Sequence, residues 1–250
     1  MKKIISTLIL LLFSQVLLAF ESGQLSLDTP NVLKKNEGSF NIRHRFYGEI
    51  NDEQTFFGTD DGGNMHFALK YALADNLVLG VDHTRDENAY GIGLEYAYYL
   101  GEFKVGARAN GFRLNRVGDE VTHPYSYMLN GSVQTPNYFD HLILTANLGY
   151  DGFYEHQIVG LGADINVNNF MPFLTFTEKV SLLAEYYPQV DKIDGISGKN
   201  DAYAYGIKFQ TYGHHFELVA TNSSNMDART MSLGTNSDDV HFGFNINRKF

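Results

Sequence analysis

The chain of 250 residues has no cysteine, no tryptophan and only five prolines. The lack of cysteine excludes a disulfide framework, a cysteine nucleophile, covalent haem attachment and lipid modification at a cysteine. Beyond the first 19 residues the sequence has no apolar run of roughly eighteen residues, the length that a transmembrane helix needs. Basic residues number 19 against 29 acidic ones, and the net charge of −10 argues against a nucleic-acid partner.

The N-terminus has the pattern of a secretory signal peptide. Lys2 and Lys3 form a charged start, residues 4–18 are almost entirely apolar, and Ala19 ends the run. We therefore expect a signal peptide over residues 1–19, with an uncleaved anchor as the alternative. Leu17 is larger than the residue usual three positions before a cleavage point, so the bond that is cut stays open within a few residues.

Glycine, tyrosine and phenylalanine are abundant (24, 16 and 19 residues), and from residue 39 onward apolar and polar residues alternate. Near the C-terminus, for example, Val240, Phe242 and Phe244 alternate with His241 and Gly243. A period of two is that of a β-strand, whose successive side chains point to opposite faces. The segments with this pattern are 39–50, 65–73, 76–84, 89–100, 103–111, 125–134, 141–150, 158–167, 180–188, 202–210, 215–221 and 240–250.

The connections between these segments alternate in length. Residues 51–63, 113–124, 189–201 and 222–238 are long and rich in acidic and polar residues, whereas "ALADN", "YLGE" and "YGHH" are short. Short turns at one end and long loops at the other are typical of an outer-membrane barrel. The segment "FMPFLTFTEK" fits a hairpin arm or a longer turn, and we favour the turn because bacterial barrels have an even strand number.

A soluble sandwich would also alternate, but two features favour the membrane. Tyrosines gather at strand ends on the apolar face, as in an interfacial aromatic girdle, and fully charged residues occupy the polar face. We therefore predict an all-β fold: a transmembrane antiparallel up-and-down β-barrel of about 12 strands. Residues 20–38 are expected to form a periplasmic lead-in, and residues 39–250 the barrel.

The charges of the polar face suggest what the lumen does. Basic residues are expected to point inward on the first five strands, and acidic ones on later strands. The inward charges are Arg43, Arg45, Lys70, Lys104, Arg108, Asp164, Glu185 and Glu217. If the two sets face each other, their field could orient a small polar or anionic solute in a narrow channel. The alternative is that these charges pair with one another and simply fill a wet interior.

The sequence offers little evidence for an enzyme active site. His214 and His215 precede Ser223 and Ser224 by about eight residues, roughly 27 Å along a strand, too far for a Ser–His pair. The two histidines also lack a third metal ligand at suitable spacing. Acidic loop pairs could bind divalent cations that bridge lipopolysaccharide, although such pairs are more often solvated. These pairs are Asp60–Asp61, Asp86–Glu87, Asp119–Glu120 and Asp238–Asp239.

Several stretches together resemble a bacterial outer-membrane β-barrel family of unassigned function. They are "RHRFYGEI", "FFGTDDGGNMHFALKYALADNLVLG", "LLAEYYP", "GIKFQTYGHHFELVATNSSNM" and "GFNINRKF", within residues 40–250. The resemblance implies the barrel fold and the cell outer membrane, and it implies no substrate or catalytic residue.

The last strand also predicts how the chain reaches the membrane. Phe242, Phe244, Ile246 and the terminal Phe250 have the pattern of the signal that the barrel-assembly machinery reads, from which Arg248 departs. The expected partners are this machinery, outer-membrane lipid and lipopolysaccharide. We expect a monomer without metal or cofactor that is not an enzyme. The functional hypothesis is a narrow channel; a barrel that docks a partner through its loops, and a membrane-embedded hydrolase, are the alternatives.

Overall fold

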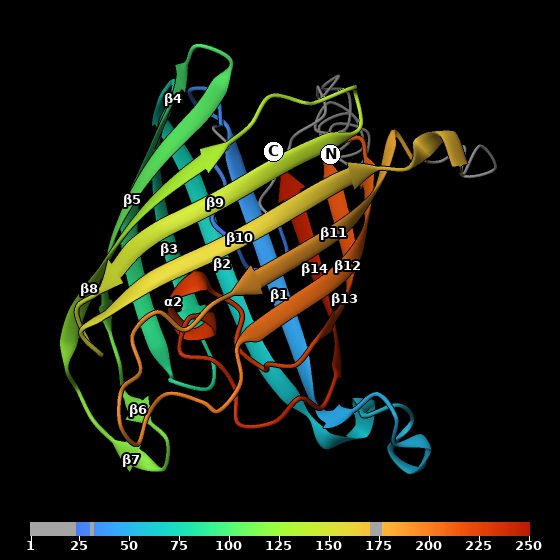
Figure 1. Cartoon of the computed structure of the whole chain (residues 1–250). Coiled ribbons are helices and arrows are strands. Elements are labelled where there is room, and N and C mark those ends of the chain that lie inside the picture. Colours follow the sequence, from blue (N-terminus) through green and yellow to red (C-terminus); the bar gives the residue numbers. More distant parts are fainter. Residues whose placement is uncertain (1–23, 31–32, 171–176) are drawn as a thin grey trace, which may run out of the picture.

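The computed structural model describes residues 24–30, 33–170 and 177–250, and most of them belong to one closed sheet. Twelve antiparallel strands form the barrel, and β1 pairs with β14 to close it (Figure 1). The barrel strands are β1 (Gly38–Glu49), β2 (Gly63–Ala74), β3 (Leu77–Thr84), β4 (Ala89–Leu100), β5 (Phe103–Arg113), β8 (Tyr125–Gln134), β9 (Leu142–Asp151), β10 (His156–Asn166), β11 (Lys179–Tyr187), β12 (Ala202–Thr211), β13 (His214–Thr221) and β14 (His241–Lys249). The predicted fold class and strand number are confirmed.

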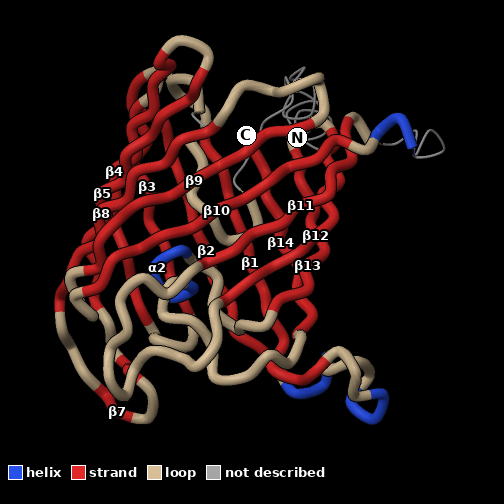
Figure 2. The backbone as a smooth tube through the Cα atoms, viewed as in Figure 1, coloured by secondary structure: helices blue, strands red, loops and turns tan. Residues whose placement is uncertain are grey.

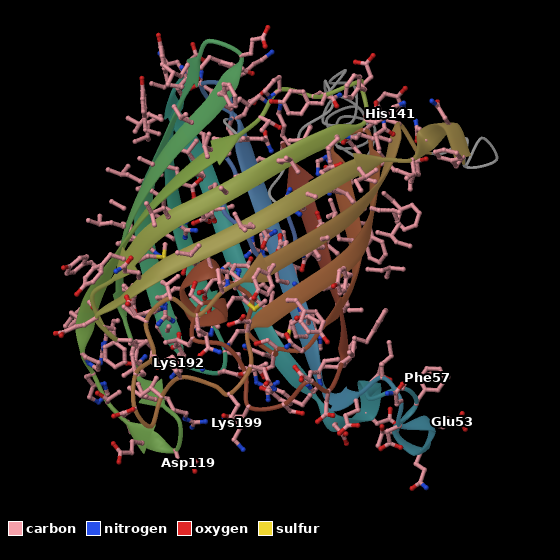
Figure 3. The ribbon with its side chains drawn as sticks, in the orientation of Figure 1. Glu53, Phe57, Asp119, His141, Lys192 and Lys199 are labelled. Atoms are coloured by element: carbon pink, nitrogen blue, oxygen red, sulfur yellow. The ribbon has the colours of Figure 1, made fainter. Side chains whose placement is uncertain are left out.

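The long connections gather at one end of the barrel, away from the C-terminus (Figure 2). They carry the small elements η1 (Glu53–Thr55), η2 (Thr59–Asp61), β6 (Arg116–Val117), β7 (Glu120–Val121) and α2 (Ala228–Met231). Glu53, Phe57, Asp119, Lys192 and Lys199 lie at this loop end, and His141 lies at the opposite end (Figure 3).

The connection between β10 and β11 settles the strand count. β10 pairs directly with β11, from Leu161 opposite Tyr186 to Asn166 opposite Ser181, so no further strand lies between them. The segment after β10 begins with the short η3 (Asn168–Phe170). The even strand number on which the predicted turn rested is therefore confirmed. Residues 171–176 of this segment lie outside the described part, so the turn itself stays a prediction.

The two faces of the sheet differ in chemistry as the alternation predicts. Apolar side chains such as Ile92, Leu148 and Leu161 are exposed on the outer face, whereas Arg45 and Glu217 are fully buried on the inner face. An apolar exterior around a polar interior suits lipid outside and a hydrated or filled lumen inside. Among the described residues no helix has both the length and the apolar character to cross a membrane.

The C-terminus forms part of the seam that closes the barrel. Gly38 and Phe250 exchange two backbone hydrogen bonds of 2.9 Å, and the Phe250 ring occupies the space that a Cβ on Gly38 would need. Phe242, Phe244 and Ile246 lie half-buried on the outer face. The residues of the predicted assembly signal thus lie along the closing strand, and its reading by the assembly machinery stays a prediction.

Candidate functional site

The lumen is occupied by a segment near the N-terminus, residues 24–30, which we call the strap. Leu25 and Leu27 of the strap are fully buried. Leu25 packs with Leu183, Ala204 and Val219 from β11, β12 and β13. Because the strap crosses the inside of the barrel, residues 24–30 differ from the expected periplasmic lead-in: their apolar side chains pack against the lumen wall.

Inward-pointing side chains bind the strap's backbone. The Ser26 amide donates to both Glu185 carboxylate oxygens (2.9 and 3.1 Å), and the Leu27 amide donates to Glu185 Oε1 (3.2 Å). From β1 and β14, Arg45 Nη2 and Asn245 Nδ2 donate to the Leu25 carbonyl oxygen at 3.2 and 2.9 Å. Both peptide faces of this stretch therefore find partners in the barrel, as a buried backbone requires.

Asp28 fixes the other end of the strap through a network of charges. Arg108 Nη1 lies 2.9 Å from Asp28 Oδ1, and Asn130 Nδ2 donates to Asp28 Oδ2 at 2.7 Å. Arg108 also lies 3.3 Å from an oxygen of Asp82 and 3.6 Å from one of Glu95. A single guanidinium on β5 thus joins the strap to β3 and β4.

Glycines on the inner face make room for the strap. A Cβ on Gly162 would lie 1.8 Å from Gln24 Oε1 and 2.5 Å from Leu27 Cδ1, and one on Gly160 would lie 2.5 Å from Leu27 Cδ2. Similarly, a Cβ on Gly206 would lie 2.6 Å from Leu25 Cδ2. The glycines of the wall therefore leave the space that the side chains of the bound strap fill.

We predict that Gly162→Val weakens the strap's attachment without unfolding the barrel. Valine suits a strand, but its side chain competes with Gln24 and Leu27 for space. Overpacking of about 1–3 kcal/mol corresponds to roughly a tenfold rise in amide hydrogen exchange at Ser26 and Leu27. The control is Gly111→Val on β5, where nothing lies within 4 Å of an added Cβ. Equal exchange in both variants would contradict the prediction.

The chain leaves the lumen at the short-turn end. The Lys35 amide donates to Asp75 Oδ1 (3.0 Å) in the turn after β2, and the Asn36 amide donates to the Ala72 carbonyl oxygen (3.1 Å). Lys249 Nζ lies 2.7 Å from Glu37 Oε1. These contacts hold residues 35–37, which follow the strap, against the rim of the barrel. The strap is therefore anchored on its C-terminal side.

A second segment, residues 222–235, enters the lumen from the loop end, and we call it the inward loop. Its helix α2 lies inside the barrel outline in Figure 1, and all four helical residues are buried. Arg229 pairs with Glu87, lies 3.9 Å from Asp151 Oδ2 and stacks over Phe112 at 4.9 Å. His156 Nε2 lies 3.1 Å from the Arg229 carbonyl oxygen.

Asp227 is the N-cap of α2, and its carboxylate makes the inward loop sensitive to pH. Its Oδ1 accepts from the Thr230 amide (2.8 Å) and the Thr230 hydroxyl (3.0 Å). Burial acts to raise the pKa of Asp227, but Arg229 and these hydrogen bonds outweigh burial and hold the pKa below its ordinary 3.8. Burial also raises the pKa of Glu87 despite its contact with Arg229.

We predict that strong acid loosens the inward loop. Since the folded pKa of Asp227 is depressed, its stabilisation is complete above the ordinary value and is lost as the pH falls through the folded pKa. A side-chain cap contributes about 1 kcal/mol. Amide exchange at Thr230, corrected for intrinsic rates, should rise about fivefold below pH 3.8. Asp227→Asn, which keeps the capping oxygen, should remove this pH dependence; a wild-type response in the variant would contradict it.

A cavity of about 110 Å³, which we call the chamber, lies between the strap and the inward loop. Strap residues 27–30 and loop residues 227–229 bound it, together with side chains of β1 to β5, β8 and β14. Its lining combines apolar residues with charged and polar ones, which include Arg43, His66, Lys70, Arg108 and Asn110. Among the described residues, the chamber is open space within the lumen.

The predicted inward charges all lie on the inner face, and most pair with near neighbours. Lys70 Nζ lies 2.7 Å from Glu95 Oε1, and Asp164 Oδ2 lies 2.5 Å from Lys208 Nζ. Asn245 Nδ2 donates to Glu217 Oε2 at 2.5 Å. Lys104, near the short-turn rim, lies 5.8 Å from the centre of the Tyr99 ring. Most of these charges thus contact near neighbours through ion pairs or hydrogen bonds and do not form two opposed walls across an open lumen.

The contributions of the strap and the inward loop were missed by sequence reasoning. "LSLD" within residues 25–28 alternates apolar and polar residues, but four residues are too few to separate it from a loop. Met226 and Met231 are apolar residues in a loop expected to be polar, and they were the available signal for burial. Arg229 lies in the same loop and is buried although it is charged.

The other chemical candidates are not assembled into sites. His215 lies near the start of β13 and Ser223 beyond its end, so the predicted separation of the two holds. Within the described residues no group of three or more His, Cys, Asp or Glu could hold a metal ion. Of the acidic loop pairs, Asp86–Glu87 is engaged, because Tyr47 donates to Asp86 and Arg229 pairs with Glu87.

A closed barrel with an apolar exterior and a charged, filled interior defines an outer-membrane β-barrel protein. The chain belongs to the family of membrane-bound β-barrel domains DUF5777, whose sequence profile matches residues 20–100 and 143–250. This match confirms the family resemblance and the outer-membrane location expected from the sequence. A comparison with the curated proteins gives no match.

Solved porin structures are similar to the chain. The KdgM porin has a TM-score of 0.48 and 14% identity over 85% of this chain and 99% of its own. The Acinetobacter baumannii outer membrane protein Omp33 has a TM-score of 0.48 and 10% identity over 86% and 99%. The NanC porin has a TM-score of 0.47 and 8% identity over 84% and 98%.

Proposed function

We propose that this outer-membrane protein is a narrow channel for small polar or anionic solutes, closed at rest by the strap. The observation that carries the proposal is the charged chamber inside the barrel, bounded by the strap on one side and the inward loop on the other. An apolar, fully packed interior would serve an anchor equally well. A polar cavity lined by charges is instead what a solute needs on its way through a lumen.

The way in which the strap is held supports a movable closure. It is a single stretch of seven residues (24–30) that joins no strand of the barrel, so its departure would leave the strand ladder intact. Its contacts are two buried leucines, hydrogen bonds to side chains such as Glu185 and Asn245, and the ion pair of Asp28 with Arg108. A closure of this size can be shifted by a few kcal/mol, the range over which conformational equilibria respond to ligands.

Single-channel recording in planar bilayers tests the proposal. We expect the purified full chain to be mostly silent with rare openings, and a variant whose strap cannot bind to conduct in steady steps. Arg43→Ala should shift the preference of these steps away from anions, because it removes a lumen cation. Silence of both the wild type and the strap variant in correctly folded, heat-modifiable protein would overturn the channel.

A non-conducting barrel is the second candidate, and the occupied lumen favours it directly. In that case the strap and the inward loop are permanent filling, as in small barrels whose interior side chains leave no passage. The recordings separate the two candidates, since a permanent plug predicts that even a loosened strap passes no current. Neither candidate assigns a catalytic residue, and we propose that the protein is not an enzyme.

A further inference from the structure

The chamber contains buried polar atoms that lack a hydrogen-bond partner. His66, Asn110 and Asn130 line it and are each more than nine-tenths buried, at 8%, 8% and 4% exposure. Within the described chain His66 Nδ1, Asn110 Oδ1 and Asn130 Oδ1 have no partner. Buried polar groups are nearly always paired, and each exception needs an explanation. Here three such unpaired atoms belong to residues that line one cavity.

Arg43 adds a cation on the same side as His66, and it lies within electrostatic range of Asp28, Glu185 and Glu217 but forms an ion pair with none of them. The two residues lie directly opposite each other in the pairing of β1 with β2. Arg43 Nη1 donates to the Met226 carbonyl oxygen, its Nε is buried without a partner, and it forms no ion pair with any described residue. By contrast, Arg45 donates four hydrogen bonds to neighbouring oxygens.

The carboxylates of the chamber are engaged elsewhere. Arg108 lies within 3.6 Å of oxygens from Asp28, Asp82 and Glu95. Glu87 pairs with Arg229, and Asp227 accepts from Thr230 at the start of α2. The β1–β2 side of the chamber therefore offers donors and positive charge, whereas the asparagines of β5 and β8 offer free acceptor oxygens.

From this division we propose that the chamber binds a small carboxylate that also carries an amino or hydroxyl group. The carboxylate would accept hydrogen bonds from Arg43, whose planar fork suits two oxygens, and from the neutral ring of His66. The amino or hydroxyl group would donate to Asn110 Oδ1 and Asn130 Oδ1. This proposal names the class of solute for the proposed channel. It depends on the proposed function only for the claim that the ligand passes through the barrel.

The size of the chamber admits a small ligand. Its volume of about 110 Å³ is several times the roughly 10–15 Å³ that one buried water molecule needs on the same measure. Two- and three-carbon acids fit this space. Glycine and glycolate therefore carry both functional groups within the available volume.

Calorimetric titration of the full chain in detergent micelles tests the site with four probes. Glycine and glycolate should bind, acetate should bind about tenfold more weakly because it lacks the donor, and ethanolamine should not bind because it lacks the carboxylate. If only glycine or only glycolate binds, the second group is identified as an amine or a hydroxyl. Binding of ethanolamine with the affinity of glycine would overturn the proposal.

Variants separate the site from general effects on the barrel. Arg43→Gln should weaken glycine or glycolate binding roughly ten- to hundredfold, since it removes hydrogen bonds from a charged donor. Asn110→Ala should weaken both without affecting acetate. The control is Arg248→Gln, which removes an exposed arginine outside the chamber and should bind as the wild type does. Unchanged binding in Arg43→Gln overturns the site. So does the absence of binding at 10 mM, roughly the weakest affinity of interest, to both the wild type and Glu185→Ala, a variant that loosens the strap.

Failure of the site and failure of the channel give different results. Binding that depends on Arg43 in a protein that never conducts leaves the site and removes the channel. Conductance in Glu185→Ala without binding of any probe leaves the channel and removes the site. Glu185→Ala loosens the strap but keeps strap residues 27–30 and the rest of the chamber lining, so a ligand excluded by the closed strap should bind to this variant.

Discussion

Replacing residues 24–30 with a glycine–serine segment of equal length is expected to turn a mostly silent protein into a steadily conducting one. The substitution removes two fully buried leucines, each contributing about 1.5–3 kcal/mol. It also removes the side chain of Asp28, which holds Arg108 and Asn130. A total of at least about 5 kcal/mol would raise the open fraction by roughly three orders of magnitude.

The length and the anchor at the rim stay unchanged in this variant, so that chain ends and export are comparable. Open probability in planar bilayers is the measurement, with heat-modifiable migration as the check of folding. The matched control replaces residues 51–57, a stretch of equal length in the exposed loop after β1, with the same glycine–serine segment, because no residue there lines the chamber. A strap variant as silent as the wild type would rule out the strap as the closure.

The barrel was predictable because its signal is local and repeated. In β10, for instance, Leu161 and Ile165 are exposed on the outer face while Gly162 and Asp164 are buried, so that each strand reports its own orientation. The burial of one face against lipid fixes the register, since a shift of one residue would turn every side chain to the wrong side. The strand number and the outer-membrane location follow from the repetition of this pattern.

The contents of the lumen were not predictable, because they depend on contacts between distant parts of the chain. Ser26 binds Glu185, 159 residues away, and Asn245 binds the Leu25 carbonyl oxygen across 220 residues. The inward direction of Glu185 follows from alternation, but its partner could have been a cation, water or, as here, a backbone. The polar face of a strand predicts which residues point into a lumen and leaves open what they meet.

The glycines of the inner face illustrate the same limit. A glycine such as Gly160 or Gly206 in a strand indicates a close approach of some other group or a bend. Only the structure identifies that group as Leu27 or Leu25 of the strap. Once the strap is known, these positions indicate that the shape of the wall matches it.

Glu185→Ala is expected to release the strap from its tightest polar contact. The carboxylate accepts from two backbone amides of the strap and from the Tyr187 hydroxyl at 2.8 Å. Without it, two buried amides lose their acceptor, at a cost of about 3 kcal/mol or roughly a hundredfold in the bound fraction of the strap. Open probability should rise by that factor, and amide exchange at Ser26 and Leu27 should rise with it.

A graded series shows whether the carboxylate acts on the strap or on the barrel as a whole. Glu185→Gln keeps one acceptor oxygen but loses the charge that strengthens these bonds, so it should fall between the wild type and Glu185→Ala. Asp164→Asn is the matched control, since Asp164 is also a buried lumen carboxylate but pairs with Lys208 on the wall. Because Asp164 makes no contact with the strap among the described hydrogen bonds and ion pairs, its loss can disturb the wall without freeing Ser26. If Asp164→Asn opened the barrel as much as Glu185→Ala, the effect would be general weakening of the wall and the specific role of Glu185 would be lost.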